Sequence, residues 1–418
     1  MDTELLVERL VQRIDKANIY FLMEIGKYIK EIGELSPTKA QQLIQVLKYG
    51  GRYEDIVRQI SKYTNLDIEE IDRIFENYAK KDQLFYKKFY EYRNIPFVEY
   101  EQNEALVRQT KALANITKQT MMNFTRSRAL GYTLKDIDGT IRFYGLRETY
   151  ERVLDEALLN VGQGKETFDM AMKNILNDLG GSGLKTLDYE SGRSIRLDSM
   201  VTMHLQDGLR NLHNENQMLF GEEFGANMVE VSHHMNSAPD HIDTIDGKQF
   251  ALIDKIKEQI KKGIETKIKL SDIDGNRVRV NGKWYDDFNY VNGKLERPVS
   301  TYNCRHYIFY GILGVTKPEF TQEQLDKDKE KNLKGFDYNG KHYSMYEGTQ
   351  LQRKLERSIR KQKDIQILGK STNNKELIGD AQKKITILSK QYKELSDISG
   401  LPTKMARLRV SGYKRSKI

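Results

Sequence analysis

Proline is scarce in the first half of this chain, and the scarcity favours long helices. Of the six prolines among 418 residues, only Pro37 and Pro96 precede residue 230. Proline is the residue that a helix interior tolerates least. The intervening sequence is rich in leucine, lysine, glutamate, glutamine and arginine, which are good helix formers. Residues 1–190 are therefore predicted to form a mostly helical N-terminal region.

Apolar side chains in residues 194–224 recur at the spacing of one helix face. The stripe consists of Val201, Leu205, Leu209 and Leu212. This pattern predicts a long amphipathic helix that ends at Gly225, where the left-handed conformation of glycine can close it.

A second stripe, in the N-terminal region, is aromatic. It consists of Tyr78, Phe85, Phe89 and Tyr92, which share a helical face. Two interpretations stay open. The stripe is either a core contact between helices or a face that docks on a neighbouring subunit or another protein.

The composition changes at Asn227, where turn signals replace helix signals. Four dipeptides favour tight hairpins: Asp246-Gly247, Asp274-Gly275, Asn281-Gly282 and Asn292-Gly293. Residues 191–320 are therefore predicted to hold the long helix and a small antiparallel-β-containing domain. The fold class that follows is α+β, with mostly helical N- and C-terminal regions around this central domain.

Residues 321–418 are predicted to be a charged linker followed by a basic helical region. The net charge of +8 favours an anionic neighbour such as nucleic acid. The candidate nucleic-acid-binding residues are Arg353, Arg357, Arg360, Lys404, Arg407, Arg409, Lys414 and Arg415. The alternative is that the helical arginines are a solvated helix face. The basic end of the chain is expected to be mobile until a partner orders it.

One cysteine and several histidines form a candidate metal site. Cys304 and His306 are two residues apart, so in an extended strand both side chains point to the same side. His234 and His241 complete a four-ligand set, and thiolate and imidazole are the ligands that zinc favours. A structural Zn²⁺ would join the first and last segments of the central domain. The alternative is a buried free cysteine beside hydrogen-bonded histidines.

Several classes of protein are disfavoured. No stretch approaches the roughly 18 consecutive apolar residues of a membrane helix, and the N-terminal sequence lacks the pattern of a secretory signal. A single cysteine cannot form an internal disulfide, so synthesis in a reducing cytoplasm is expected. The P-loop, the dinucleotide-binding glycine motif, GxSxG and HExxH are all missing.

Motifs in a fixed order carry a family resemblance. They are Val-Glu-Val-Ser-His-His at 229–234, Ala-Pro-Asp-His at 238–241, Gly-Lys-Gln-Phe at 247–250 and Asn-Cys-Arg-His at 303–306, with further motifs at 346–361 and 407–413. In order and spacing, this set resembles the phage minor capsid protein 2 family of tailed bacteriophages. The resemblance covers about residue 191 to the C-terminus. This chain has Tyr302 where the family often has tryptophan.

The resemblance implies a virion component inside the head at the portal vertex, made in the host cytoplasm. Its expected role is head assembly and genome packaging or delivery. The implied partners are the portal protein and other head proteins, with packaged double-stranded DNA nearby, several copies per virion and no membrane. Positions that match the family are His234, His241, Asn303, Cys304 and His306.

Two other functions stay open beside the structural, non-enzymatic one. A zinc-dependent hydrolase or nuclease carried in the virion would use three protein ligands and a water molecule. An acid or base would then come from His233, Asp240, Asp243 or Asp246. A toxin or effector carried by the capsid is a third hypothesis, although residues 321–418 show no catalytic motif.

Overall fold

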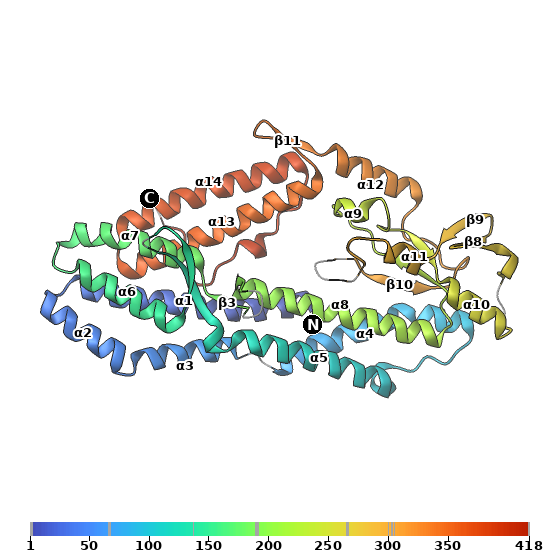
Figure 1. The fold of residues 1–418 in the computed structure, drawn as a ribbon, viewed down its shortest axis with the longest axis horizontal. Coiled ribbons are helices and arrows are strands. Elements are labelled where there is room, and N and C mark those ends of the chain that lie inside the picture. Colours follow the sequence, from blue (N-terminus) through green and yellow to red (C-terminus); the bar gives the residue numbers. More distant parts are fainter. Residues whose placement is uncertain are drawn as a thin grey trace. The chain divides into compact units, whose positions relative to one another are not determined.

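The computed structural model describes residues 3–65, 68–136, 138–188, 192–264, 267–299, 301, 304 and 306–416. Tyr302, Asn303 and Arg305, which belong to the motifs above, lie outside these residues. The predicted α+β class is confirmed, because long helices form both ends of the chain and the sheets are small and antiparallel (Figure 1). Among the described residues, no helix combines the length and the apolar character needed to span a membrane.

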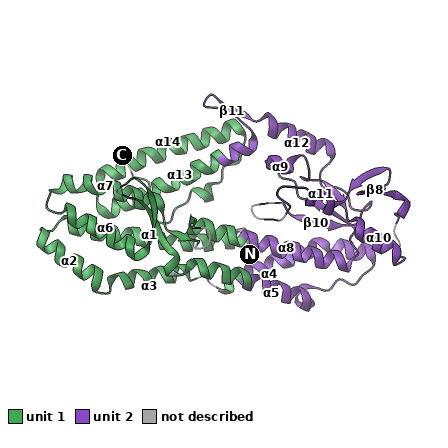
Figure 2. Cartoon of the chain, viewed as in Figure 1, with its two compact units in different colours: residues 1–71, 116–205, 351–418 green, residues 72–115, 206–350 purple. Residues whose placement is uncertain are grey.

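The chain divides into two compact units, each assembled from several segments (Figure 2). Unit 1 consists of residues 1–71, 116–205 and 351–418, and unit 2 of residues 72–115 and 206–350. The three regions predicted from composition follow the order of the sequence, whereas each unit combines segments that are distant in sequence.

Unit 1 is built mainly from helices. They are α1 (Thr3–Gly33), α2 (Pro37–Tyr49), α3 (Arg52–Thr64), α6 (Leu146–Asn160), α7 (Lys165–Ser182), most of α13 (Met345–Thr372) and α14 (Lys375–Ser399). Parts of α5 (Glu104–Thr125) and α8 (Leu197–Glu223) also belong to it. α1 contacts α3 and α6, and its core side chains, such as Phe21 and Leu22, are fully buried.

Unit 1 also contains a sheet that the sequence analysis did not predict. Its strands are β1 (Leu130–Lys135), β2 (Ile141–Gly145), β3 (Lys185–Leu187) and β4 (Ser194–Arg196), in the order β2-β1-β3-β4. All the neighbours are antiparallel, and α6 and α7 pack against β1. The short strands β3 and β4 lack a clear alternation of polar and apolar residues, which is the signal that predicts a strand.

Residues 401–416, here called the C-terminal segment, pack onto unit 1 instead of being mobile. Val410 is buried against Ile19. The backbone N–H of Ser411 donates to the Asp15 carboxylate at 2.7 Å. Buried apolar side chains thus anchor the segment, while its basic side chains stay exposed. These are Lys404, Arg407, Arg409, Lys414 and Arg415.

Unit 2 has a helical part and a β-containing part. The helices include most of α4 (Ile68–Arg93), the rest of α5 and α8, α9 (Pro239–Ile242), α10 (Ile253–Lys261), α11 (Phe288–Gly293) and α12 (Gln322–Lys334). In the aromatic stripe of α4, Phe89 is buried and stacks on Phe224, as the core interpretation predicts. Phe85 and Tyr92 are about half exposed.

The central strand of unit 2 separates two hydrophobic clusters. The sheet order is β10 (Ile308–Gly311), β5 (Met228–Val231) and β6 (Gln249–Ala251), with antiparallel neighbours. Since alternate side chains of a strand point to opposite faces, Met228 joins one cluster while Val229 and Val231 join the other. Cys304 belongs to the second cluster, so the candidate metal ligands lie at the edge of this core.

Two small sheets complete unit 2. One has the order β7 (Ile273–Asp274), β8 (Arg277–Val280) and β9 (Lys283–Asp286), and the other pairs β11 (Phe336–Tyr338) with β12 (Lys341–Tyr343). The predicted hairpin at Asn281-Gly282 is confirmed, because both residues have the positive φ of a type I′ turn between β8 and β9. The hairpin signal at Asn292-Gly293 is wrong, since both residues belong to α11.

Candidate metal centre

An antiparallel strand pair brings the two stretches that carry the candidate ligands together. β5 and β10 pair with Val231 opposite Ile308. The backbone N–H of Ser232 donates to the carbonyl of Tyr307 at 2.9 Å, so the pairing continues one residue further. In an antiparallel pair, the residues after one strand lie beside those before the other. Residues 232–241 therefore face the stretch that leads into β10.

Three of the four predicted ligands converge in this place. The donor atoms of His241, Cys304 and His306 all lie within 4.8 Å of one another. The Nδ1 atoms of His241 and His306 are 3.2 Å apart, and the Cys304 Sγ is 3.6 Å from the His306 Nδ1. The three residues are 1%, 1% and 3% exposed, so the site is closed to bulk solvent.

The opposite nitrogen of each imidazole has a hydrogen-bond acceptor. His241 Nε2 lies 2.7 Å from the carbonyl oxygen of Arg297, and His306 Nε2 lies 2.8 Å from Asp246 Oδ1. Because a carbonyl or carboxylate oxygen can only accept, both Nε2 atoms carry hydrogen. The two Nδ1 atoms then face each other as potential ligands.

Asp246 is the residue that accepts most of the hydrogen bonds around the site. Its Oδ1 accepts from Ser237 Oγ at 2.6 Å and from the backbone N–H of His234 at 2.9 Å, and its Oδ2 lies 2.6 Å from His233 Nδ1. Sequence reasoning named Asp246 only as a possible acid or base and did not name Ser237. For Asp246, the Asp-Gly turn was the only local signal, because no residue pattern links it to His233, His234 and Ser237 upstream or to His306, which is 60 residues away.

The surroundings of Asp246 favour an ionised carboxylate beside the imidazoles. Burial opposes the charge on Asp246, but hydrogen bonds from His233, His306 and Ser237 outweigh it and hold its pKa well below the ordinary value. Burial also opposes the charged form of His306, yet Asp246 and Cys304 raise its pKa to about 9. Burial lowers the pKa of His241. The site therefore attracts positive charge to the space between the two imidazoles.

His234, the fourth predicted ligand, lies next to the other three. Its ring centroid is 4.8 Å from that of His306, with the rings at 69°. Its Nε2 is 3.2 Å from Ser232 Oγ, and it is not among the three residues whose donor atoms converge. The structure thus brings together His241, Cys304 and His306 and places His234 beside them.

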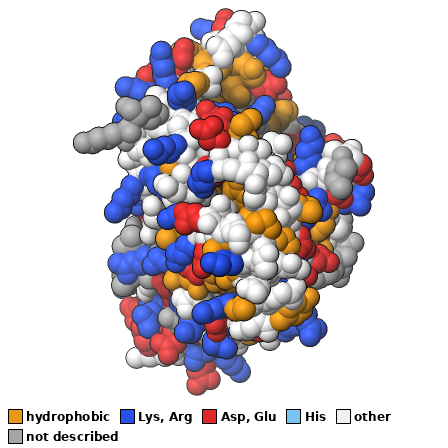
Figure 3. Space-filling view, turned by 90° about the vertical axis from the view of Figure 1, so that its left-hand side faces the viewer, with side chains coloured by type: hydrophobic (Ala, Val, Ile, Leu, Met, Phe, Trp, Pro, Cys, Tyr) orange, Lys and Arg blue, Asp and Glu red, His pale blue; other side chains and the backbone are white. Residues whose placement is uncertain are grey.

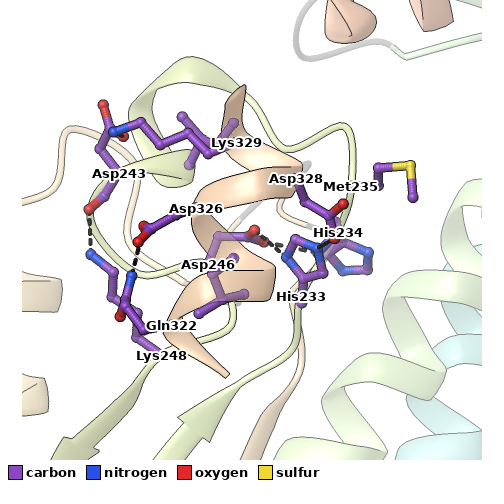
Figure 4. A pocket seen from close by; sticks show the side chains of 12 residues that line it. His233, His234, Met235, Asp243, Asp246, Lys248, Gln322, Asp326, Asp328 and Lys329 are labelled. Atoms are coloured by element: carbon purple, nitrogen blue, oxygen red, sulfur yellow. Dashed lines mark hydrogen bonds and ion pairs between the residues drawn. The ribbon is translucent and has the colours of Figure 1, made fainter. Parts of the chain in front are cut away.

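His233 forms hydrogen bonds both to the candidate metal site and to α12. It lines a pocket whose other walls include Asp246 and residues of α12 (Figure 4). Its Nδ1 contacts Asp246, and its Nε2 is 3.2 Å from Asp328 Oδ2 on α12. The hydrogen bond to Asp246 is the main reason why the pKa of His233 is raised. The other acid and base candidates, Asp240 and Asp243, pair with Arg297 and Lys329 instead.

The predicted nucleic-acid-binding residues differ in accessibility. On α13, Arg357 is exposed, Arg353 is half-buried, and Arg360 is largely buried and pairs with Asp198 inside unit 1. In the C-terminal segment, Arg409 pairs with Glu8 at 2.6 Å. The exposed basic side chains that remain suited to a phosphate backbone lie mainly in that segment.

Comparison with known proteins gives one result. A family described as Phage minor capsid protein 2 matches residues 2–397, which include all of unit 2, most of unit 1 and every candidate metal ligand. The match therefore extends over the N-terminal helices, where the resemblance noted in the sequence was only general. No curated protein and no solved structure matches the chain.

Proposed function

Because this chain belongs to the phage minor capsid protein 2 family, we propose that it acts inside the phage head at the portal vertex, in head assembly and in genome packaging or delivery. Membership of the family makes it a structural protein of the virion, with other head proteins as partners. The match over residues 2–397 is the observation that carries the proposal. The proposal further specifies that the protein lies at the portal and that each virion contains several copies.

The burial of the candidate metal centre supports a structural role over a hydrolase or nuclease. A catalytic zinc keeps one coordination position open to water and substrate. Here His241, Cys304 and His306 are at most 3% exposed, which leaves no route for a macromolecular substrate such as DNA. The pocket beside His233 is lined by ion-paired side chains, among them Asp243 with Lys329.

The portal location predicts a specific pattern of cross-links in purified virions. Lysines of this protein should form cross-links with the portal protein, detected by mass spectrometry, at a stoichiometry of several copies per particle. Protease should degrade the protein only after the heads are opened, because it lies inside them. Degradation in intact virions, or cross-links confined to the tail or the outer shell, would contradict this location.

We further propose that the C-terminal segment faces packaged DNA. One face of the molecule carries many Lys and Arg side chains, but Asp and Glu lie among them (Figure 3). In the C-terminal segment no acidic residue occurs, and Lys404, Lys414 and Arg415 are exposed. A segment that has basic residues and no acidic residue suits a phosphate backbone better than a surface on which acidic and basic side chains are mixed.

Replacing Lys414 and Arg415 with glutamine should weaken DNA binding and its salt dependence. Each lost phosphate contact lowers the slope of log K against log salt by about 0.9, so the double variant should lose about 1.8. Filter binding of duplex DNA across a salt series measures this slope. The matched control replaces the exposed Lys261 and Lys262, at the C-terminal end of α10, with glutamine and should keep the original slope. Equal slopes for both double variants would exclude the proposed contact.

A further inference from the structure

We propose that His241, Cys304 and His306 bind one Zn²⁺ through Nδ1, Sγ and Nδ1, and that this ion is a structural cross-link within unit 2. The proposal rests on the geometry of these side chains alone. It therefore holds whether or not the protein acts at the portal vertex.

Two of the three distances between the donor atoms match a tetrahedral zinc site. Zn–N bonds of about 2.0–2.1 Å and Zn–S bonds of about 2.3 Å, at tetrahedral angles, separate two nitrogens by about 3.3–3.4 Å and a nitrogen from a sulfur by about 3.6 Å. The observed separations are 3.2 Å for His241 Nδ1 to His306 Nδ1 and 3.6 Å for Cys304 Sγ to His306 Nδ1. The third separation, between the donor atoms of His241 and Cys304, is at most 4.8 Å, so one ion can lie among the three donors.

The hydrogen bonds around the two imidazoles fix the tautomer that metal binding requires. Arg297 O and Asp246 Oδ1 each accept from an Nε2–H, so in the neutral form that binds a metal the lone pair of each ring is on Nδ1. Two lone pairs 3.2 Å apart repel each other unless a proton or a metal cation lies between them, and a bound metal would take the place of the proton. Ligating histidines almost always donate their other N–H to a carboxylate or a carbonyl, as both do here.

The types of donor atom indicate which metal binds, and the burial of the site indicates that the metal is structural. Thiolate and imidazole favour zinc over magnesium or calcium, which prefer oxygen ligands. The ligands come from α9 and from the stretch before β10, so the ion joins segments that follow the first strand and precede the last strand of the sheet. Such a cross-link stabilises the folded state because the unfolded chain has no preformed site.

Three protein donors leave one coordination position, which we assign to an enclosed water molecule, because donors at most 3% exposed leave no path for a substrate to displace it. His234 is the nearest further imidazole, but its Nε2 contacts Ser232 Oγ. It is also outside the group of converging donors. His234→Ala should therefore retain zinc, and complete loss of zinc from this variant would overturn the three-ligand assignment.

Elemental analysis of the full-length protein tests the proposal directly. The protein purified under reducing conditions, or dialysed against Zn²⁺ and then buffer, should contain about one equivalent of zinc. His241→Ala and Cys304→Ala should each lower the zinc content at least about tenfold, the scale seen when ligand shells are disrupted. His342→Ala is the matched control, since His342 is an exposed histidine of unit 2 that contacts Asp337, and it should keep the metal.

Two measurements on the wild-type protein cover the case in which a variant fails to fold. A strong chelator should lower Tm, and added Zn²⁺ should restore it. Substitution with Co²⁺ should give the absorption of a tetrahedral thiolate complex. Well under one equivalent of zinc after dialysis, together with a Tm that the chelator leaves unchanged, would overturn the proposal. The site would then be a pair of buried histidines that share a proton beside a cysteine that binds no metal.

Discussion

Replacing Arg196 with methionine should lower the free energy of unfolding by about 3–5 kcal/mol, the scale seen when one partner of a buried ion pair is removed. Arg196 closes β4 and extends into the interior of unit 1. Its Nη1 donates to Asp364 Oδ2 at 2.8 Å and its Nε to Asp198 Oδ1 at 3.2 Å. Asp364 is fully buried. Without the guanidinium, its carboxylate would lose its only hydrogen-bond partner among the described residues.

The loss is large because the cluster is buried, so water cannot solvate the carboxylates that lose the guanidinium group. Although burial opposes the charged form of Arg196, Asp198 and Asp364 outweigh it and keep its pKa above the ordinary value. Arg360 also pairs with Asp198, so one positive charge would remain in the cluster. Its guanidinium pairs with Asp198 Oδ2, and its charge acts on Asp364 more weakly than the charge of Arg196 does, so it would not replace the lost partner.

Denaturant-induced unfolding measures the effect, and two further variants make it specific. Arg142→Met is the matched control, because Arg142 forms surface ion pairs in the same unit with its side chain 58% exposed. It should change stability by at most about 0.5 kcal/mol. Adding Asp364→Leu to Arg196→Met should recover part of the loss, since it removes the stranded carboxylate. A loss below about 1 kcal/mol for Arg196→Met would show that the pair is not a buried one.

Helices were the part of the fold that local sequence predicted best. The stripe from Val201 to Leu212 predicted α8 to within three residues of its observed start. Such periodicity is a local property, and a helix satisfies its own backbone hydrogen bonds. The sheet of unit 1 was missed because β3 and β4 have three residues each and depend on pairing with β1 and with each other.

The candidate metal site was predictable in its ligands but not in its surroundings. Cys304 and His306 were recognisable because their two-residue spacing implies a common face. The place of His241 depends on the pairing of β5 with β10, which no local pattern specifies. The acceptor from Arg297 is a backbone carbonyl, and backbone groups carry no signal in the residue type.

For charged residues, the sequence alone did not predict which side chains are buried. Arg360 looks in the sequence like its neighbour Arg357, yet one is largely buried in an ion-pair cluster and the other is exposed. The cluster depends on Asp198, which is distant in sequence. Nucleic-acid binding by these residues stays a prediction, and the burial of Arg360 indicates that its first role is to stabilise unit 1.

Replacing Asp15 with asparagine should stabilise the protein, and the stabilisation should be larger at pH 8 than at pH 5 by roughly 1–3 kcal/mol. The buried cluster contains three carboxylates, Asp15, Asp198 and Asp364, against the guanidinium groups of Arg196 and Arg360. One negative charge is therefore uncompensated. Asp15 is the carboxylate farthest from Arg196, with Oδ1 at 3.9 Å from Nη2, and it is the one expected to take up a proton.

The direction of the pH dependence follows from the pKa of Asp15. Burial, and then the charge of Asp364, raise this pKa from 3.8 to about 7. Between these two values the folded protein holds a proton that the unfolded chain releases, so this residue makes stability fall as pH rises through the interval. Asparagine cannot ionise, and its side-chain oxygen can still accept from the Ser411 N–H, so the variant should lose this pH dependence without losing the contact.

Unfolding curves at pH 5 and pH 8 separate this effect from the titration of other groups, because the quantity of interest is the difference between variant and wild type at each pH. Asp55→Asn is the control, since the Asp55 side chain is 55% exposed and pairs with Arg58 on the surface of unit 1. It should show the same small difference at both pH values. An Asp15→Asn difference that does not change between pH 5 and pH 8 would mean that the cluster binds no extra proton. The imbalance of three carboxylates and two guanidinium groups would then have to be compensated by another cation within unit 1.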